Sequence, residues 1–299
     1  MRILNRTAGR LSRHRRGPLA GLLVLVLGLL LTGGLYAVLA PAQADNTDQD
    51  NAALVKEGRE LFLVGCAFCH GQNGEGILTQ GGSQYGPALT DVGAAAVDFQ
   101  VGTGRMPMAV PGSQAPRKKV VYNDKEIEAL AAYVASLGTG PAVPDADLYD
   151  TSSPGDLNGD GTEDEKDRDL LVTRGSQIFL ANCTACHNFE GSGGAMPRGG
   201  FAPKIRGVDS KHIYEAMLTG PQSMDTFSDG NIPPEDKKAV IAYLETLDKS
   251  PSYSGFTFGG LGPVSEGIIA WLCGLGLLVG FAVWIAAHTT RTSKQKDEA

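Results

Sequence analysis

Charge is missing from two long stretches of this 299-residue chain, and basic charge is scarce between them. No Asp, Glu, Lys or Arg occurs at 17–44 or at 267–287. Nine of the 26 basic residues lie at the two ends, in 1–16 and 291–299, which leaves 17 in the body at 45–255 beside 30 of the 33 acidic residues. This acidic body disfavours nucleic acid as a partner and suits docking against a basic protein face.

The first uncharged stretch predicts a membrane segment. Its apolar core of ~20 residues, about 19–39, matches a bilayer core of ~30 Å at ~1.5 Å per residue. A secretory signal usually has a shorter apolar region of ~7–15 residues, which favours a retained anchor. The sequence Ala42-Gln43-Ala44 offers a cleavage site instead, so a signal peptide at 1–44 stays open. Both alternatives export the body of the chain.

The second uncharged stretch predicts a C-terminal transmembrane helix at 263–288. Arg291, Lys294 and Lys296 follow it, and the positive-inside rule places the tail, 289–299, in the cytoplasm. The body is then on the extracytoplasmic side of the cell membrane. Cys273 lies within this helix and is interpreted as a packing residue.

Cysteine is also scarce, and its pattern argues against a disulfide framework. Four of the five cysteines form two C-x-x-C pairs, and each pair is followed directly by histidine. C-x-x-C-H is the attachment signature of c-type haem, because one helical turn brings two thiols to one porphyrin edge and a histidine to the iron. The sequence therefore predicts two covalent haems, on Cys66, Cys69 and His70 and on Cys183, Cys186 and His187.

The surroundings of the two motifs repeat. Residues 54–70 recur at 171–187 as L-V-x-x-G-x-x-x-F-L-x-x-C-x-x-C-H, and 132–137 recur at 242–247 as A-Y-[VL]-x-x-L. Such landmarks in the same order indicate two copies of one small domain. Each copy is expected to be a helix, a long Gly- and Pro-rich loop (71–112 or 191–207) and a helix (124–137 or 234–247). The domains are placed at 45–140 and 167–252, with an acidic linker at 141–166.

Methionine is the expected sixth iron ligand. Met106 lies 36 residues after His70, and Met224 lies 37 residues after His187. We prefer Met106 to Met108 for its spacing and its Met-Pro step, although aligning Thr103-Gly104 with Thr219-Gly220 favours Met108. Met/His ligation raises the reduction potential and closes the iron to small molecules, which favours electron transfer over catalysis.

Other methionines are weaker candidates for the second iron. Met196 follows His187 too closely, and Met217 lies on an expected helix (211–218), where a core role is the simpler interpretation. Pro87 and Pro203 follow their histidines by 17 and 16 residues. Their carbonyls are candidates to accept the Nδ1–H of the axial histidine, with simple turn prolines as the alternative.

Both copies resemble class I cytochromes c, whose pattern runs from G-x-x-x-F before C-x-x-C-H through G-P-x-L and M-P to A-Y-[VL]-x-x-L. The second copy departs from it with Asp225 after Met224. Two such domains between two membrane segments resemble the dihaem cytochrome c subunit of the actinobacterial quinol–cytochrome c reductase. The resemblance implies a mainly α protein in a menaquinol-oxidising cytochrome bc complex. It also implies cytochrome b and Rieske iron–sulfur partners, and electron delivery to cytochrome c oxidase.

Three alternatives remain. One is a dihaem electron-transfer subunit of another oxidase or dehydrogenase, which the C-terminal helix disfavours. A second is a dihaem peroxidase, which needs an open or displaceable distal position. The third is a calcium-responsive surface module, because Asp156, Asn158 and Asp160 match the first half of an EF-hand loop. Position 12 of that loop is Asp167 where a glutamate is usual, and a solvated acidic linker is the competing interpretation.

Overall fold

The computed structural model of the chain describes residues 18–39, 44–82, 84–112, 114–196, 199–249 and 263–297. The chain divides into two units, residues 1–53 and 54–299. The first unit holds α2, Pro18–Leu39, and the start of α3, Ala44–Gly65. The basic segment 1–16 and most of the candidate cleavage site lie outside the described residues. The choice between anchor and signal peptide therefore stays open.

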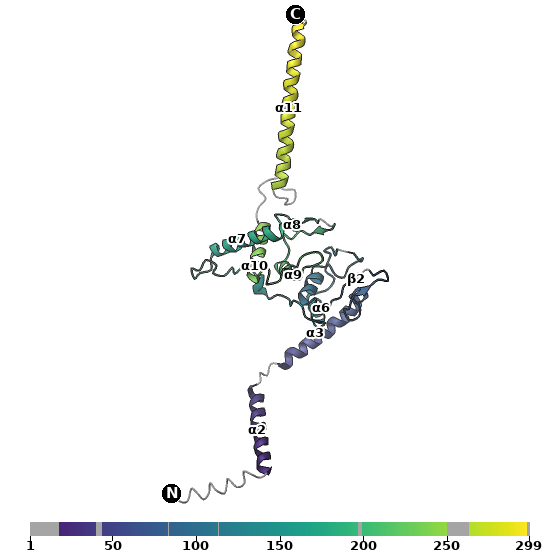
Figure 1. Ribbon diagram of the computed structural model, residues 1–299, viewed down its shortest axis with the longest axis vertical. Helices are drawn as coiled ribbons and strands as arrows, with labels where there is room; N and C mark the ends of the chain where they lie inside the picture. Colours follow the sequence, from purple (N-terminus) through teal and green to yellow (C-terminus); the bar gives the residue numbers. More distant parts are fainter. Residues whose placement is uncertain are drawn as a thin grey trace. The chain divides into compact units, whose positions relative to one another are not determined.

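The second unit contains both copies of the repeat, and the predicted mainly helical fold is confirmed (Figure 1). The first copy contains the end of α3, then α4 (Ala67–His70), β1 (Ile77–Leu78), β2 (Gln84–Gly86), α5 (Ala94–Gly102) and α6 (Asp124–Ala135). The second contains α7 (Glu165–Asn182), α8 (Thr184–His187), β3 (Gly194–Ala195), β4 (Phe201–Ala202), α9 (Ser210–Thr219) and α10 (Pro234–Lys249). A single 3₁₀ turn, η1 (Ala146–Leu148), lies between them.

The same helix crossing organises both copies. A Cβ on Gly58 would lie 1.9 Å from the Ala129 carbonyl oxygen, and a Cβ on Gly175 would lie 1.9 Å from that of Ala239. The first helix of each copy therefore meets the last one through a glycine that no other residue can replace without moving the backbone. The repeat read from the sequence is confirmed at this contact.

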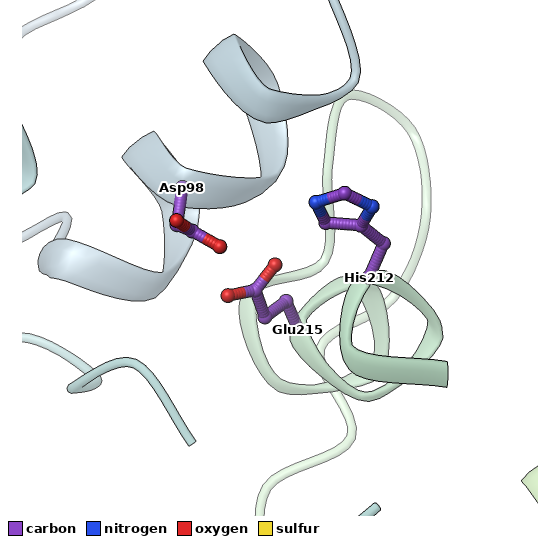
Figure 2. A group of neighbouring side chains, drawn as sticks. All are labelled: Asp98, His212 and Glu215. Atoms are coloured by element: carbon purple, nitrogen blue, oxygen red, sulfur yellow. The ribbon is translucent and has the colours of Figure 1, made fainter. Parts of the chain in front are cut away.

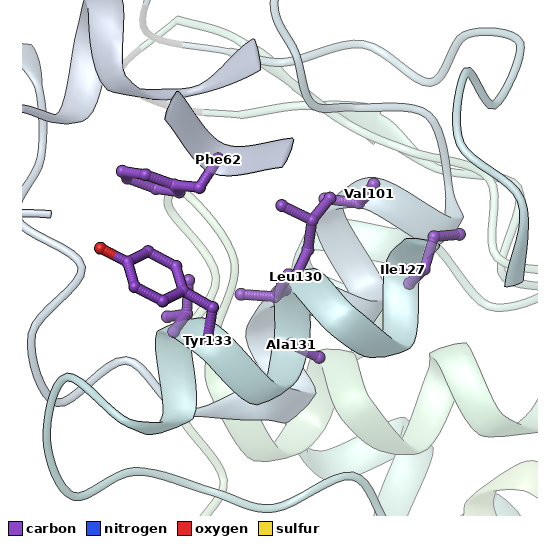
Figure 3. Packing of buried hydrophobic residues seen from close by; sticks show 8 residues of the cluster. Phe62, Val101, Ile127, Leu130, Ala131 and Tyr133 are labelled. Carbon is purple, nitrogen blue, oxygen red and sulfur yellow. The ribbon is translucent and has the colours of Figure 1, made fainter. Parts of the chain in front are cut away.

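An aromatic pair beside each crossing anchors the core. The rings of Phe62 and Tyr133 lie 5.1 Å apart, and those of Phe179 and Tyr243 lie 5.4 Å apart. Figure 3 shows the first pair packed beside Leu130 of α6. Phe62 and Phe179 are 1% and 0% exposed, so each contributes ~1.5–3 kcal/mol from burial of its side chain.

Local sequence sets where the helices begin. The Asn123 side chain accepts a hydrogen bond from the Glu126 backbone N–H, and the Glu126 carboxylate accepts one from the Asn123 N–H. Asp164 and Asp167 form the same reciprocal capping box at the start of α7. This cap starts the helix at Glu165, two residues before the expected domain boundary.

The predicted plan of helix, loop and helix was incomplete. The first loop, 71–112, contains α5 and the β1–β2 hairpin, and the second copy has a β3–β4 hairpin at the matching place. α5 has the sequence AAAVDFQVG and begins after Gly93, which offers no side-chain cap. The loop therefore gave no start signal for this helix, although α5 packs against α6.

The two copies are joined by side-chain contacts. The Gln114 amide donates to the Phe201 carbonyl (3.0 Å) and accepts from the Phe201 N–H (3.1 Å). The Gln222 amide donates to the Ala115 carbonyl at 3.2 Å. The connection between the copies also makes contacts: just before the linker the Thr139 N–H donates to Asp91, and within the linker the Thr151 hydroxyl donates to Glu245.

The C-terminal helix is α11, Pro263–Asp297. Among the described residues, Gly267–His288 is the one segment long and apolar enough to cross a membrane, with a mean hydropathy of 2.4 and no burial against the rest of the chain. Cys273 is exposed on it. In α2, the described apolar part is the shorter stretch Gly21–Thr32.

Candidate functional site

Each C-x-x-C-H motif lies at the joint between two helices. Cys66 follows the end of α3 and is the N-cap of α4, which the remaining residues form, and the His70 N–H donates to the Cys66 carbonyl at 3.0 Å. In the second copy, the His187 N–H donates to the Cys183 carbonyl at 2.9 Å. The one-turn geometry that the attachment chemistry needs is present in both copies.

The carbonyls of Pro87 and Pro203 orient the histidines of the two motifs. His70 Nδ1 lies 2.7 Å from the Pro87 carbonyl oxygen, and His187 Nδ1 lies 3.0 Å from that of Pro203. A carbonyl can only accept, so Nδ1 carries the proton and Nε2 is left with a lone pair for a metal. The prediction that these carbonyls hold the histidines is confirmed, and the simple turn interpretation is wrong.

A short loop carries each proline to its histidine. Gly76 N–H donates to the His70 carbonyl at 2.7 Å, and Gly193 N–H donates to the His187 carbonyl at 3.0 Å. Both glycines have positive φ, 79° and 78°, a conformation that side chains disfavour. In the first copy, a Cβ on Gly86 would lie 2.0 Å from the Cys69 carbonyl oxygen. These glycines let the loop pass directly over the attachment turn.

The donor set fits a covalently held haem. None of the four cysteines of the motifs is in a disulfide, so all four sulfur atoms are available for thioether bonds. Burial lowers the pKa of His187, although its bond to Pro203 opposes the shift. A neutral imidazole is the form that ligates iron.

The candidate methionines differ in how they pack. Met106 packs against the first core cluster together with Cys66, and Met224 packs against the second together with Cys183. Met108 belongs to neither cluster. Met217 is 4% exposed within the second core, so its predicted core role is confirmed. Met196 lies in the β3–β4 turn, where its N–H donates to the Gly200 carbonyl.

The linker loop forms turns of the EF-hand kind. Asp156 accepts from the backbone N–H groups of Gly159 and Gly161, and Asp160 accepts from that of Thr162. The buried Asp167, at position 12, accepts from the backbone N–H of Asp164 and from those of Asn158 and Leu157, which lowers its pKa. Calcium binding by Asp156, Asn158 and Asp160 stays a prediction.

A different polar cluster lay outside every sequence prediction. Asp98 on α5 faces His212 and Glu215 on α9, and one ligand atom of each lies within 4.8 Å of the others (Figure 2). The i, i+3 spacing of His212 and Glu215 is a weak signal for a shared helix face. Asp98 belongs to the other copy of the repeat, and no sequence pattern connects it to them.

The attachment turns and the crossing helices define the class of protein. Family models match both copies: residues 55–138 match cytochrome c, and residues 171–244 match cytochrome c oxidase, cbb3-type, subunit III. The chain is a c-type cytochrome that binds haem c covalently.

Whole-chain relatives narrow this class. The chain is 41% identical over 284 residues to the cytochrome bc1 complex cytochrome c subunit of Corynebacterium diphtheriae, covering 94% of this chain and 98% of the relative. It is 38% identical to the subunit of that name from Mycobacterium bovis, covering 94% and 95%. The chain belongs to the family of cytochrome bc1 complex cytochrome c subunits, and it is a membrane-associated electron-transfer protein.

Two further likenesses are weaker. The cbb3-type cytochrome c oxidase subunit FixP of Bradyrhizobium diazoefficiens is 25% identical, covering 73% of this chain and 70% of the relative. A chain of the Kuenenia stuttgartiensis reducing HAO-like protein complex has a TM-score of 0.33 at 14% identity, covering 64% of this chain and 96% of that one. This structural likeness carries no argument.

Proposed function

We propose that this chain is the dihaem subunit that carries electrons from the Rieske protein of a menaquinol-oxidising cytochrome bc complex to cytochrome c oxidase. The observation that carries the proposal is the duplicated attachment turn. In both copies a carbonyl accepts from the histidine Nδ1, which leaves Nε2 for iron. In this scheme the chain is an electron carrier, and oxidoreductase and translocase activity belong to the whole complex.

The residues proposed to hold the two haems are divided evenly between the copies. Cys66 and Cys69, and Cys183 and Cys186, supply the thioether bonds, while His70 and His187 are the proximal ligands. Met106 and Met224 are the proposed distal ligands, and their packing against the same clusters that Cys66 and Cys183 contact supports this assignment over Met108. When bound, the haems supply two one-electron couples.

Other features of the chain support a location for this electron transfer. The two domains are held by Gln114, Gln222 and the linker contacts rather than by a free tether. We place them on the extracytoplasmic side, with the helix at Gly267–His288 as the membrane anchor. The acidic body is suited to basic docking faces on partner proteins.

A second candidate is the dihaem subunit of another oxidase. The match of the second copy to cbb3-type subunit III, and the FixP likeness, favour it. The 41% identity over nearly the full chain favours the bc complex instead.

The test is purification of the tagged full chain from its own membranes in mild detergent. We expect cytochrome b, a Rieske protein and oxidase subunits to co-purify, with two haems c per chain. The preparation is expected to oxidise menaquinol with oxygen and no added soluble cytochrome c. Met106→His is expected to slow this reaction, with Met108→Leu as the matched control. Recovery of the chain alone, or with a dehydrogenase, would overturn the proposal and leave a free-standing carrier.

A further inference from the structure

The contact between α5 and α9 contains an unusual group of side chains. α5 belongs to the first copy of the repeat and carries Asp98, while α9 belongs to the second and carries His212 and Glu215. Figure 2 shows the three side chains gathered between these helices, and their ligand atoms lie within 4.8 Å of one another. Two carboxylates and an imidazole thus meet at the boundary between the domains.

Glu215 is the anomaly in this group. Its side chain is 0% exposed, and no hydrogen bond is made to either carboxylate oxygen. Buried carboxylates without partners are costly and therefore rare in folded proteins. A buried acid aimed at a second acid and a histidine indicates a missing positive partner.

Lys211 makes its ion pair with Asp98 and does not hydrogen-bond to Glu215. Its ammonium nitrogen lies 2.6 Å from Asp98 Oδ2, and its side chain reaches the pair from the solvent side, 30% exposed. A carboxylate has two oxygens, so Asp98 can keep this ion pair and still offer an oxygen to a metal. Such an outer contact orients a ligating carboxylate.

We propose that Asp98, His212 and Glu215 bind a divalent transition-metal ion of the zinc class at the junction of the two haem domains. One imidazole nitrogen with two carboxylate oxygens is a donor set that suits Zn²⁺ better than Ca²⁺ or Mg²⁺, which prefer oxygen ligands alone. Three protein ligands leave a position for water.

The surroundings give an ion a route and hold the histidine. A cleft of ≈ 890 Å³ is lined by Asp98, Lys211 and His212 together with Asp209. The His212 ring packs edge-on against Phe99, with 6.3 Å between centroids. A Cβ on Gly102 would lie 3.0 Å from His212 Nε2, so the glycine leaves room for the ring.

The consequence is a cross-link between domains. Because Asp98 comes from α5 and the other two ligands come from α9, a bound ion ties the two helices together. This contact is separate from both C-x-x-C-H turns, so the site binds its ion whether or not the proposed route of electrons is correct.

The experiment measures zinc binding to the full-length, haem-loaded chain in detergent. The chain carries a tag without histidine and is washed with EDTA, and iron measured by mass spectrometry counts the chains. We expect one tightly bound Zn²⁺ per chain in competition with a chromophoric chelator. Glu215→Gln and His212→Gln are each expected to weaken binding by more than ~100-fold, because even outer-shell changes cost ~10–100-fold. X-ray absorption should show one imidazole among the zinc ligands.

Asp209→Asn is the matched control. It removes a carboxylate from the same cleft, and asparagine keeps the helix cap that Asp209 provides to the Lys211 N–H. This variant should bind zinc like the unchanged chain. An unaltered haem spectrum and an unaltered melting temperature in EDTA show that each variant is folded. Glu215→Gln and His212→Gln are two separate tests of the same site. Equal affinity in all four proteins, or no stoichiometric zinc in the unchanged chain, would overturn the proposal.

Discussion

The two copies of the repeat agree at the C-x-x-C-H turn and its supporting contacts, and they differ at buried positions elsewhere. Both have the same glycine crossing, the same aromatic pair and the same bond from histidine to a proline carbonyl. They differ at position 127, where the first has a buried isoleucine and the second, 110 residues on, has the buried Lys237. His70 is buried, whereas His187 is only partly so. The two domains thus share the contacts that support the attachment turn, while a buried position of the last helix differs between them.

The largest expected effect is the loss of haem from one copy while the other keeps its haem. Replacing both Cys183 and Cys186 by alanine should remove one haem per chain and leave the first domain loaded, because each turn holds its own thiols. Haem content per chain and the mass of the protein measure this. Cys273→Ala is the control and should change neither quantity. Loss of both haems would show that the second domain supports the first.

Substitution of the glycine at either helix crossing should destabilise the protein to a similar extent. Gly58→Ala and Gly175→Ala each place a Cβ 1.9 Å from a carbonyl oxygen, and each should lower the free energy of unfolding by ~1–3 kcal/mol or more. Denaturant unfolding measures the loss. Gly81→Ala, in an open part of the first loop, should stay within about 0.5 kcal/mol. Strongly unequal effects of Gly58→Ala and Gly175→Ala would mean that the copies do not share one architecture.

Substituting the proposed distal ligands should change the reduction potential of one haem at a time. Met106→His and Met224→His should each lower the potential of one haem and leave the other unchanged, since replacing a thioether by a nitrogen ligand favours the oxidised iron. A redox titration followed by absorbance resolves the two couples. Met108→Leu should shift neither potential, and a shift there would move the ligand assignment from Met106 to Met108.

Replacing the buried Lys237 by an apolar residue should change the free energy of unfolding only slightly. Its ammonium nitrogen lies 2.6 Å from Asp229 and 2.8 Å from the Ile232 carbonyl. Asp229 is itself 60% exposed, so it remains hydrated when the lysine is lost. Lys237→Met should therefore change the free energy of unfolding by ~0.5–1.5 kcal/mol, the usual net value of a hydrogen bond. Lys237→Ala, which adds a cavity, should cost more in the same measurement.

The smallest effect concerns the linker that joins the copies. If the loop at 156–167 binds calcium, titration calorimetry on the full chain should show a binding heat that Asp160→Ala abolishes. Asp150→Ala, outside the loop, serves as the control. A chain that releases no calcium-dependent heat would leave the loop as a set of hydrogen-bonded turns.

Local spacing made the attachment sites and the repeat predictable. The motif C-x-x-C-H, the glycine four residues before each Phe62 or Phe179, and the prolines that follow the histidines all act within one short segment or one copy. α5 was missed because its small apolar sequence has neither a cap nor a clear periodicity. The cluster of Asp98 with His212 and Glu215 was missed because it exists only when two copies pack together.

Gln114 fastens a loop of one domain to the hairpin of the other through both ends of a single amide. Two redox domains on a flexible linker would exchange an electron only when they collided, and the time between collisions would limit turnover. Because the Gln114 contacts hold these two domains together, electron exchange between them would need no such collision.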